Sequence, residues 1–255
     1  MWKLWTVTEH LRLDVDGYVA VLTIDRPAKR NAMSLEMWAA IPELIKQAEA
    51  RVLVIRGTDH FSAGADIAEF ATLRAGAEGA LRYGAVVHAA ERAIATYDRP
   101  TIAAINGACV GGGCEIALAC DIRIAAPDAR FGITPAKLGI VYNLTSTKQL
   151  VDAVGPAWAK QILCTAEIID ADTALRIGLV NELHEDPLAR AGELAAMIAA
   201  RAQFSVRGAK TIVNRIMAGH TEEDDEVRAL YAESAGSADY AEGVAAFLEK
   251  RSPQF

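Results

Sequence analysis

Residues 106–115 have the sequence NGACVGGGCE, with three consecutive glycines between two apolar segments. The segment before them, Thr101–Ile105, is short and rich in apolar and β-branched residues, which favours a buried strand. The segment after them, Ile116–Ala119, favours a helix. Glycines at a strand-to-helix junction let the backbone approach a ligand closely and direct its N–H groups toward it, where the positive end of the helix adds to their field.

Glu115 lies in the first turn of the expected helix, a few residues from those N–H groups. N–H donors with a carboxylate beside them are what an enzyme needs to stabilise an oxyanion and to move a proton. The alternative is a tight turn in which Glu115 only complements the helix dipole, a gain of about 0.3–1 kcal/mol. Both interpretations fit the stretch taken alone.

The overall composition favours a globular protein that binds no nucleic acid. The chain has 255 residues, of which 52% are hydrophobic and 23% charged, enough to bury a full core. A net charge of -7 argues against a nucleic-acid partner, although a few local cations suffice for one small phosphorylated ligand. The chain has no apolar run of about 20 residues and its N-terminal stretch does not resemble a signal peptide, so we expect a cytoplasmic protein that does not enter the membrane.

Cysteine and histidine spacing gives no indication of a metal site. Three of the four cysteines (Cys109, Cys114 and Cys120) fall in or beside the strand–helix unit, and none of the four forms a C-x-x-C pair. We expect these cysteines to be small buried hydrophobic residues, and we expect no metal, because the five histidines also lack ligand spacing.

Along the whole chain, strands alternate with helices up to about residue 187, and only helices are expected beyond it. Alternation of this kind predicts an α/β body over residues 1–187, with strand–strand–helix units possible around the glycine stretch. Residues 188–255 form a helical region, with helices expected over 188–202, 205–218, 222–235 and 239–250. Strands are expected at Val19–Ile24, Arg51–Gly57, Ile122–Ala126 and Leu179–Leu183.

Two segments of the body are harder to assign. Ser34 is a plausible N-cap for a helix whose apolar residues recur up to Ala48, but Pro42 predicts a kink or break near residue 41. Residues 68–82 are rich in alanine and glycine with little pattern, and we expect a mobile segment there.

The order of several motifs resembles the crotonase superfamily, which is the enoyl-CoA hydratase/isomerase family, over nearly the whole chain. These motifs are Asp25–Pro27 with Asn31–Ala32, Phe61–Ile67, Arg99–Gly107, Gly111–Glu115, Cys120–Arg123, Ala171–Leu175 with Gly178–Val180, and Phe247–Arg251. The resemblance implies an α/β spiral of strand–strand–helix (ββα) units, with a helical C-terminal region that builds homotrimers, often paired into hexamers. It also implies an acyl-CoA thioester substrate from fatty acid metabolism and no separate cofactor, because coenzyme A is part of the substrate.

The resemblance also implies roles for individual residues. The backbone N–H groups of Ala65 and Gly112 would hold the thioester oxygen as it gains enolate character, with Glu115 as a catalytic acid–base residue. Removing one such donor costs about 3–4 kcal/mol of transition-state stabilisation. Coenzyme A contacts carry over to eight positions, the last two supplied by a neighbouring subunit: Arg26, Ala28, Ala32, Ala63, Asp66, Ile67, Phe247 and Lys250. As alternatives, Phe247 is a core aromatic residue and Lys250 is solvated.

The second catalytic glutamate of the hydratases is missing. It lies in a Phe-Gly-x-Pro-Glu stretch, and in the corresponding stretch, residues 131–139 (FGITPAKLG), its place is taken by Pro135. Residues Thr134–Asn143 instead resemble the methylmalonyl-CoA decarboxylase branch, in which Tyr142 would donate a proton or orient the leaving carboxylate. One departure is Ala65, where that branch can carry a histidine.

We therefore expect an acyl-CoA lyase, with a slight preference for decarboxylation of a malonyl-type thioester. Decarboxylation generates its own carbanion, so an oxyanion hole and one proton donor suffice. The alternatives are an enoyl-CoA hydratase or isomerase that uses Glu115 alone, with Tyr142 as a packed aromatic residue. Other classes fit less well: the glycines do not follow the G-x-G-x-x-G spacing of dinucleotide-binding proteins, no G-x-S-x-G motif of serine hydrolases is present, and the acidic charge opposes an RNA-binding role.

Overall fold

The computed structural model describes residues 3–255, with side chains from Thr8 onward, so that Met1 and Trp2 at the start of the predicted 1–187 body lie outside the described residues. Its strands are β1 (Lys3–Thr8), β2 (Leu11–Asp16), β3 (Val19–Ile24), β4 (Val52–Gly57), β5 (Thr101–Ile105), β6 (Ala108–Val110), β7 (Ile122–Ala125), β8 (Arg130–Gly132), β9 (Ile169–Asp170) and β10 (Glu182–Leu183). Its α-helices are α1 (Leu35–Lys46), α2 (Phe70–Leu73), α3 (Gly76–Ala95), α4 (Gly112–Ala119), α5 (Leu144–Thr165), α6 (Ala171–Arg176), α7 (Pro187–Ala199), α8 (Gln203–Met217), α9 (Asp225–Ala235) and α10 (Ala238–Glu249).

The body is built on a seven-stranded sheet with the order β1-β2-β3-β4-β5-β7-β10. β1, β2 and β3 are antiparallel neighbours, whereas β3, β4, β5, β7 and β10 run parallel. A smaller sheet has the order β6-β8-β9. Because parallel strands end at the same edge of a sheet, the loops that follow β4 and β5 lie next to each other.

The same short pattern recurs along the body. A strand of the large sheet is followed by a short second pairing and then by a helix, as in β5, β6 and α4. After β3 and β4 the second pairing is an isolated bridge, from Met33 to Ala65 and from Ser62 to Cys109, respectively. These strand–strand–helix units confirm the predicted α/β spiral, and the two bridges join the loops after three neighbouring strands.

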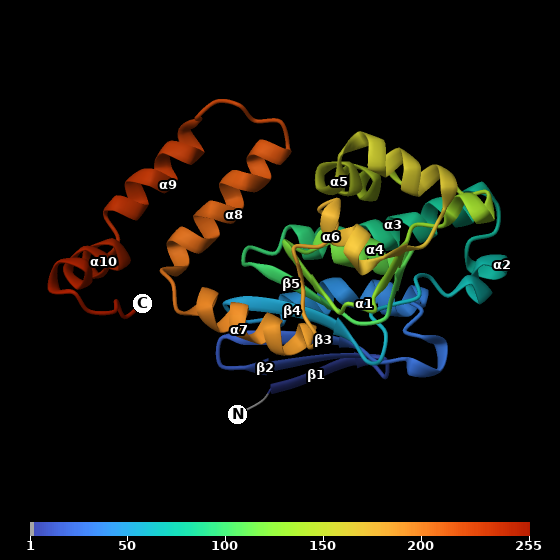
Figure 1. Cartoon of the computed structure of the whole chain (residues 1–255), viewed down its shortest axis with the longest axis horizontal. Coiled ribbons are helices and arrows are strands. Elements are labelled where there is room, and N and C mark those ends of the chain that lie inside the picture. The colour runs from blue at the N-terminus through green and yellow to red at the C-terminus, as the bar shows by residue number, and fades with distance from the viewer. Residues whose placement is uncertain (1–2) are drawn as a thin grey trace.

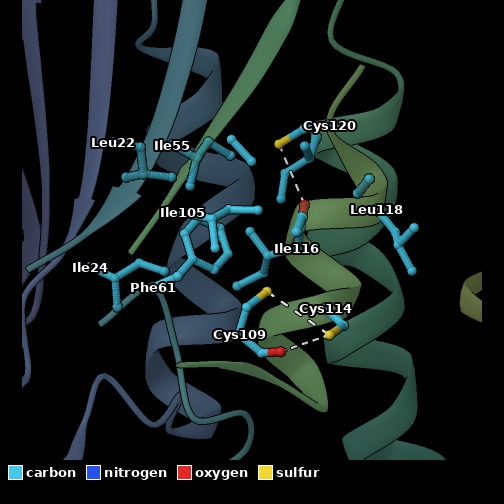
Figure 2. Packing of buried hydrophobic residues seen from close by; sticks show 14 of the residues in the cluster. Leu22, Ile24, Ile55, Phe61, Ile105, Cys109, Cys114, Ile116, Leu118 and Cys120 are labelled. Carbon is cyan, nitrogen blue, oxygen red and sulfur yellow. Dashed lines mark hydrogen bonds between the residues drawn. The ribbon is translucent and has the colours of Figure 1, made fainter. Parts of the chain in front are cut away.

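The core lies on both faces of the large sheet. Figure 2 shows Ile55 of β4 and Ile105 of β5 pointing toward Ile116 of α4. On the opposite face, Val52 and Val54 of β4 pack with Ala191 and Ala195 of α7. Two covered faces explain why β5 and most of β3 and β4 are apolar, and each fully buried Val, Leu or Ile contributes about 1.5–3 kcal/mol.

The three cysteines of the glycine region are buried, as predicted. Cys109 and Cys114 lie side by side with their sulfur atoms 3.9 Å apart, and Cys114 Sγ lies 2.9 Å from the Cys109 carbonyl oxygen (Figure 2). Cys120 contacts the carbonyl oxygen of Ile116. The fourth, Cys164, is exposed at the end of α5.

The C-terminal region consists of helices close to the predicted ranges. α7 covers one face of the sheet, and α8, α9 and α10 extend beside the body (Figure 1). Lys210 attaches α8 to the body, because its Nζ lies 2.7 Å from Asp121 Oδ2 and 2.9 Å from the Arg99 carbonyl oxygen.

One helix prediction was wrong, and one segment without a clear pattern is helical. α1 continues through Pro42 without a break, because its apolar face (Trp38, Ile41, Leu44) is buried and offsets the cost of about 3 kcal/mol for an interior proline. Residues 68–82 lie mostly in α2 and in the first turns of α3, and their mobility stays a prediction. The ring of Phe70 in α2 packs edge-on against Tyr83 of α3, with centroids 5.3 Å apart.

Candidate active site

Ala65 and Gly112 line one cavity where the loops after β4 and β5 meet, and each has a backbone N–H group. In the first loop, Met33 donates to the Gly64 carbonyl (2.7 Å) and accepts from Asp66 N–H (2.8 Å), so Ala65 N–H is left out of the bridge. Gly112 is the first residue of α4, where an N–H has no acceptor within its own helix. Among the described residues, neither N–H donates a hydrogen bond to the protein.

Glycine is required where these loops touch. Gly64 has φ +97°, and a Cβ there would lie 2.7 Å from the Val110 carbonyl oxygen and 3.2 Å from the Gly112 nitrogen. A Cβ on Gly113 would lie 2.5 Å from the Ser62 carbonyl oxygen. The glycines thus bring the two loops into direct contact, which explains why both are built from small residues.

The two N–H groups open into a cavity of about 780 Å³, a size typical of small-molecule sites. Its walls come from the two loops, from α3 and from the segment before α5, and include Ala63, Ala65, Ile67, Tyr83, Gly112, Glu115, Pro135 and Tyr142. Glu115 is the only carboxylate among the described lining residues, while Arg74, His88 and Lys137 carry nitrogen bases or cations.

Glu115 is held in a buried, polar corner of this cavity. Its Oε1 lies 3.3 Å from Asn143 Nδ2 and 3.4 Å from Ser146 Oγ. Burial, followed by the charge of Glu91, raises the pKa of Glu115 to about 8, although the Ser146 hydroxyl partly offsets this rise. A carboxyl with this pKa is mostly protonated at neutral pH, so it can donate a proton.

Tyr142 and Pro135 also lie at the cavity. The Tyr142 hydroxyl is buried and makes no hydrogen bond within the described residues, and burial raises its pKa well above the ordinary value. Pro135, which takes the place of the second glutamate of the hydratases, begins a 3-10 turn over Pro135–Leu138 and lines the cavity. The described cavity lining contains no carboxylate near this turn.

The predicted coenzyme A residues fall into two groups. Ala63 and Ile67 line the cavity, whereas the Arg26, Ala28, Ala32 and Asp66 side chains do not. Asp66 is buried and binds Arg26 at 2.8 Å and Lys29 at 2.9 Å, and these cations lower its pKa. Arg26 also donates to the Ala32 carbonyl (3.1 Å), so the basic loop and the cavity loop form one unit.

Phe247 and Lys250 lie far along the chain, at the end of α10. Phe247 is 83% exposed and lines a separate cavity of about 440 Å³ formed by the C-terminal helices. Neither residue lines the cavity that contains Glu115, so a role there would require a second copy of the chain.

Two residues of the site were missed by sequence reasoning. Glu91 of α3 is completely buried, and Ser146 Oγ contacts both its Oε1 and that of Glu115. The available signal was an acidic residue within the apolar stripe of α3, between Val87 and Ile94. Ser146 lies in the first turn of α5 and gave no signal of its own.

Comparisons with known proteins agree with this fold. Residues 14–255 match the family model for enoyl-CoA hydratase/isomerase. The chain is 38% identical to the crotonyl-CoA hydratase of Syntrophomonas wolfei, over 97% of this chain and 98% of that protein. It is also 38% identical to the short-chain-enoyl-CoA hydratase of Clostridium acetobutylicum, over 94% of each.

A solved structure shows the same fold. The enoyl-CoA hydratase/carnithine racemase of Magnetospirillum magneticum superposes with a TM-score of 0.92 at 36% identity, covering 97% of this chain and 96% of that one. The chain therefore belongs to the enoyl-CoA hydratase/isomerase family. Within residues 3–255, no helix is long and apolar enough to cross a membrane, and no group of three metal-binding side chains is found.

Proposed function

We propose that the protein hydrates a short-chain 2-enoyl-CoA, with the thioester oxygen held by the N–H groups of Ala65 and Gly112. The observation that carries this proposal is a single carboxyl, Glu115, with a pKa raised to about 8, beside two unpaired backbone donors. Donors that are already oriented stabilise the negative charge on the thioester oxygen without reorganisation, and such charge stabilisation is usually the largest contribution to catalysis.

One neutral carboxyl can perform both proton transfers of a hydration. The water oxygen bonds to Cβ of the substrate, and one water proton passes to the carbonyl oxygen of the Glu115 carboxyl. The proton on the other carboxyl oxygen passes to Cα, where the C=C electrons form the new C–H bond. Glu115 ends the cycle neutral, so Pro135 in place of a second glutamate is no obstacle.

The names of the compared relatives support hydration and a short acyl chain. Proteins named crotonyl-CoA hydratase and short-chain-enoyl-CoA hydratase align with nearly the whole of this chain. The decarboxylase branch has no counterpart among them, so we place hydration before the decarboxylation that residues 134–143 suggested.

Decarboxylation of a malonyl-type thioester is the second candidate, favoured by Arg74. This side chain lines the cavity and, among the described residues, forms no ion pair, so it could receive a substrate carboxylate. The bond between Cα and that carboxylate would break, carbon dioxide would leave, and its electron pair would form the enolate. Glu115 would then protonate Cα, and solvent would reprotonate Glu115.

Product analysis separates the two reactions. The protein is incubated with crotonyl-CoA and, separately, with methylmalonyl-CoA, and the products are identified by mass. Hydration predicts 3-hydroxybutyryl-CoA, and its loss in Glu115→Gln. Propionyl-CoA from the second substrate, abolished in Tyr142→Phe and Arg74→Gln, would instead assign the decarboxylase. Neither product in wild-type protein would reject both.

We further propose that coenzyme A binds across subunits of a homotrimer or hexamer, with Phe247 and Lys250 supplied by the neighbouring copy. Exposed apolar residues on the C-terminal helices support this assembly: Ile216, Met217, Tyr240, Phe247 and Leu248. Acyl-CoA at a hundred times its Kd is expected to stabilise the fold by about 2.7 kcal/mol. An unchanged melting temperature with saturating acetyl-CoA and butyryl-CoA would contradict coenzyme A binding.

A further inference from the structure

Behind the cavity, Glu115 meets a second buried carboxyl that no substrate can touch. Glu91 extends from α3, is 0% exposed and does not line the cavity. Ser146 Oγ is in contact with Glu91 Oε1 and lies 3.4 Å from Glu115 Oε1. Asn143 Nδ2 lies 2.7 Å from Ser146 Oγ and 3.3 Å from Glu115 Oε1, so one small polar group joins the two acids.

The donors in this cluster are too few for two carboxylates. Ser146 has one hydroxyl proton, and its Oγ already accepts from Asn143. Glu91 Oε2 is buried with no hydrogen-bond partner among the described residues. Two ionised carboxylates in such surroundings repel each other and lack solvation, and pairs of this kind retain a proton.

We propose that Glu91 is a positioning residue, whose negative charge beside Glu115 keeps Glu115 in the acid form that protonates the substrate. The inference rests on the proposed function, in which the Glu115 O–H bond breaks as the Cα–H bond forms. Ser146 Oγ is in contact with Glu91 Oε1 but lies 3.4 Å from Glu115 Oε1, so its one hydroxyl proton favours the ionised form of Glu91. When the pair carries one proton, that proton then lies on Glu115, on the cavity side.

Other groups that face Glu115 act more weakly or in the opposite direction. Tyr83 of α3 and Tyr142 are both held neutral by burial, which raises the pKa of Tyr83 to about 12 and that of Tyr142 well above its usual value. Arg74, after α2, favours the ionised form of Glu115. Among the described neighbours of Glu115, Glu91 is therefore the one whose negative charge favours the neutral form of Glu115. Its effect is second in size to that of burial.

The structure predicts opposite effects for two substitutions. Glu91→Gln keeps the shape and the contact with Ser146 but removes the charge, so the pKa of Glu115 should fall by about one unit or more. Ser146→Ala removes a hydroxyl that favours the ionised forms of both acids, so the pKa of Glu115 should rise. Loss of packing alone would not shift the pKa in opposite directions.

The experiment titrates the Glu115 carboxyl by NMR in full-length protein labelled with ¹³C at glutamate side chains, using Glu115→Gln to assign the signal. The matched control is Glu78→Gln, an exposed α3 glutamate paired only with Arg82, which should leave the titration unchanged. Circular dichroism confirms that each variant is folded. A Glu115 midpoint that is the same in wild type, Glu91→Gln and Ser146→Ala overturns the inference, whether or not any thioester is turned over.

The pH–rate profile is the second measurement. For the substrate that the wild type converts, the pH at which activity falls should move down by about one unit in Glu91→Gln, with activity at pH 6 within a factor of about three of wild type. At pH 8 the same variant should have about one fifth of the wild-type activity. If wild-type protein converts no thioester, the proposed function fails, while the NMR titration still tests the effect of the Glu91 charge on Glu115.

Discussion

Gly64→Ala is expected to damage catalysis by separating the two loops that carry the N–H donors. The native φ of +97° is unfavourable for any residue with a Cβ, at a cost of about 1–3 kcal/mol. The added Cβ would lie 2.7 Å from the Val110 carbonyl oxygen, whereas ordinary contacts begin at 3.4 Å, so the loops must part by about 0.7 Å. That carbonyl directly precedes Gly111 and Gly112, so the movement reaches one donor of the pair.

The expected loss is about 100-fold in kcat. Displacement of a reacting group by about 1 Å costs about 10²-fold, and complete loss of one oxyanion donor costs about 10²–10³-fold. Since the donors act mainly on the developing negative charge, KM should change by less than about threefold. Stability should fall by about 2 kcal/mol from backbone strain and contact together.

The assay combines steady-state kinetics on the accepted thioester with urea denaturation. The matched control is Gly192→Ala, on the exposed face of α7, where a Cβ meets nothing within 4 Å. This control should keep full activity and gain about 0.5–1 kcal/mol of stability, because alanine is favoured within a helix. A Gly64→Ala protein that folds and retains kcat within threefold of wild type would refute the assignment of Ala65 and Gly112 as the oxyanion donors.

Three further predictions concern the site and its assembly. Glu115→Gln should lower kcat by about 10²–10⁴-fold, and wild-type activity should fall above pH about 8. Because folding raises the pKa of Glu115, the stabilising effect of its proton is fully present below the ordinary pKa of 4.5 and is lost as the pH rises through about 8. Urea denaturation at several pH values should find this dependence in the wild type and not in the variant. Asp66→Asn should destabilise the protein by about 2 kcal/mol at pH 7, where Asp66 forms ion pairs with Arg26 and Lys29. Because folding lowers the pKa of Asp66, the difference in stability between wild type and variant should shrink as the pH falls below 3.8. Equal pH dependence of stability in both proteins would disprove the assignment. Light scattering should give a mass three or six times 27.2 kDa for wild type and a smaller one for Phe247→Asp, since Phe247 is 83% exposed; a wild-type monomer would contradict the proposed assembly.

Much of the α/β body could be predicted because its signals are local. The strands at Val19–Ile24 and Thr101–Ile105 coincide with β3 and β5, since buried parallel strands are short apolar runs. Ser34 caps α1 as expected, with Met37 N–H donating to its Oγ at 3.2 Å. The small-residue loops after β4 and β5 lie together, as the family resemblance implied, and the close contact at Gly64 explains their glycines.

What could not be predicted depends on contacts between distant parts of the chain. α3 is irregular in sequence at its N-terminal end because one side of it, including Ala80 and Gly84, forms the wall of a cavity rather than packing on a core. Glu91 was overlooked because its meaning comes from Ser146, 55 residues later, and from Glu115 on another helix. The unbroken course of α1 through Pro42 likewise reflects burial, which outweighs a local preference.

Two parts of the cavity differ in how readily mutations can change them. The half that we propose to stabilise charge consists of main-chain N–H groups that nearly every amino acid possesses, so point mutations seldom delete them. The opposite wall, from the start of α3 and residues 134–144, consists of side chains, including Leu81, Leu138 and Val141, which are 76%, 51% and 94% exposed. Because these side chains support little of the core, they can be exchanged without unfolding the protein. Redesign of acyl selectivity should therefore begin with this wall, while the glycine loops stay untouched.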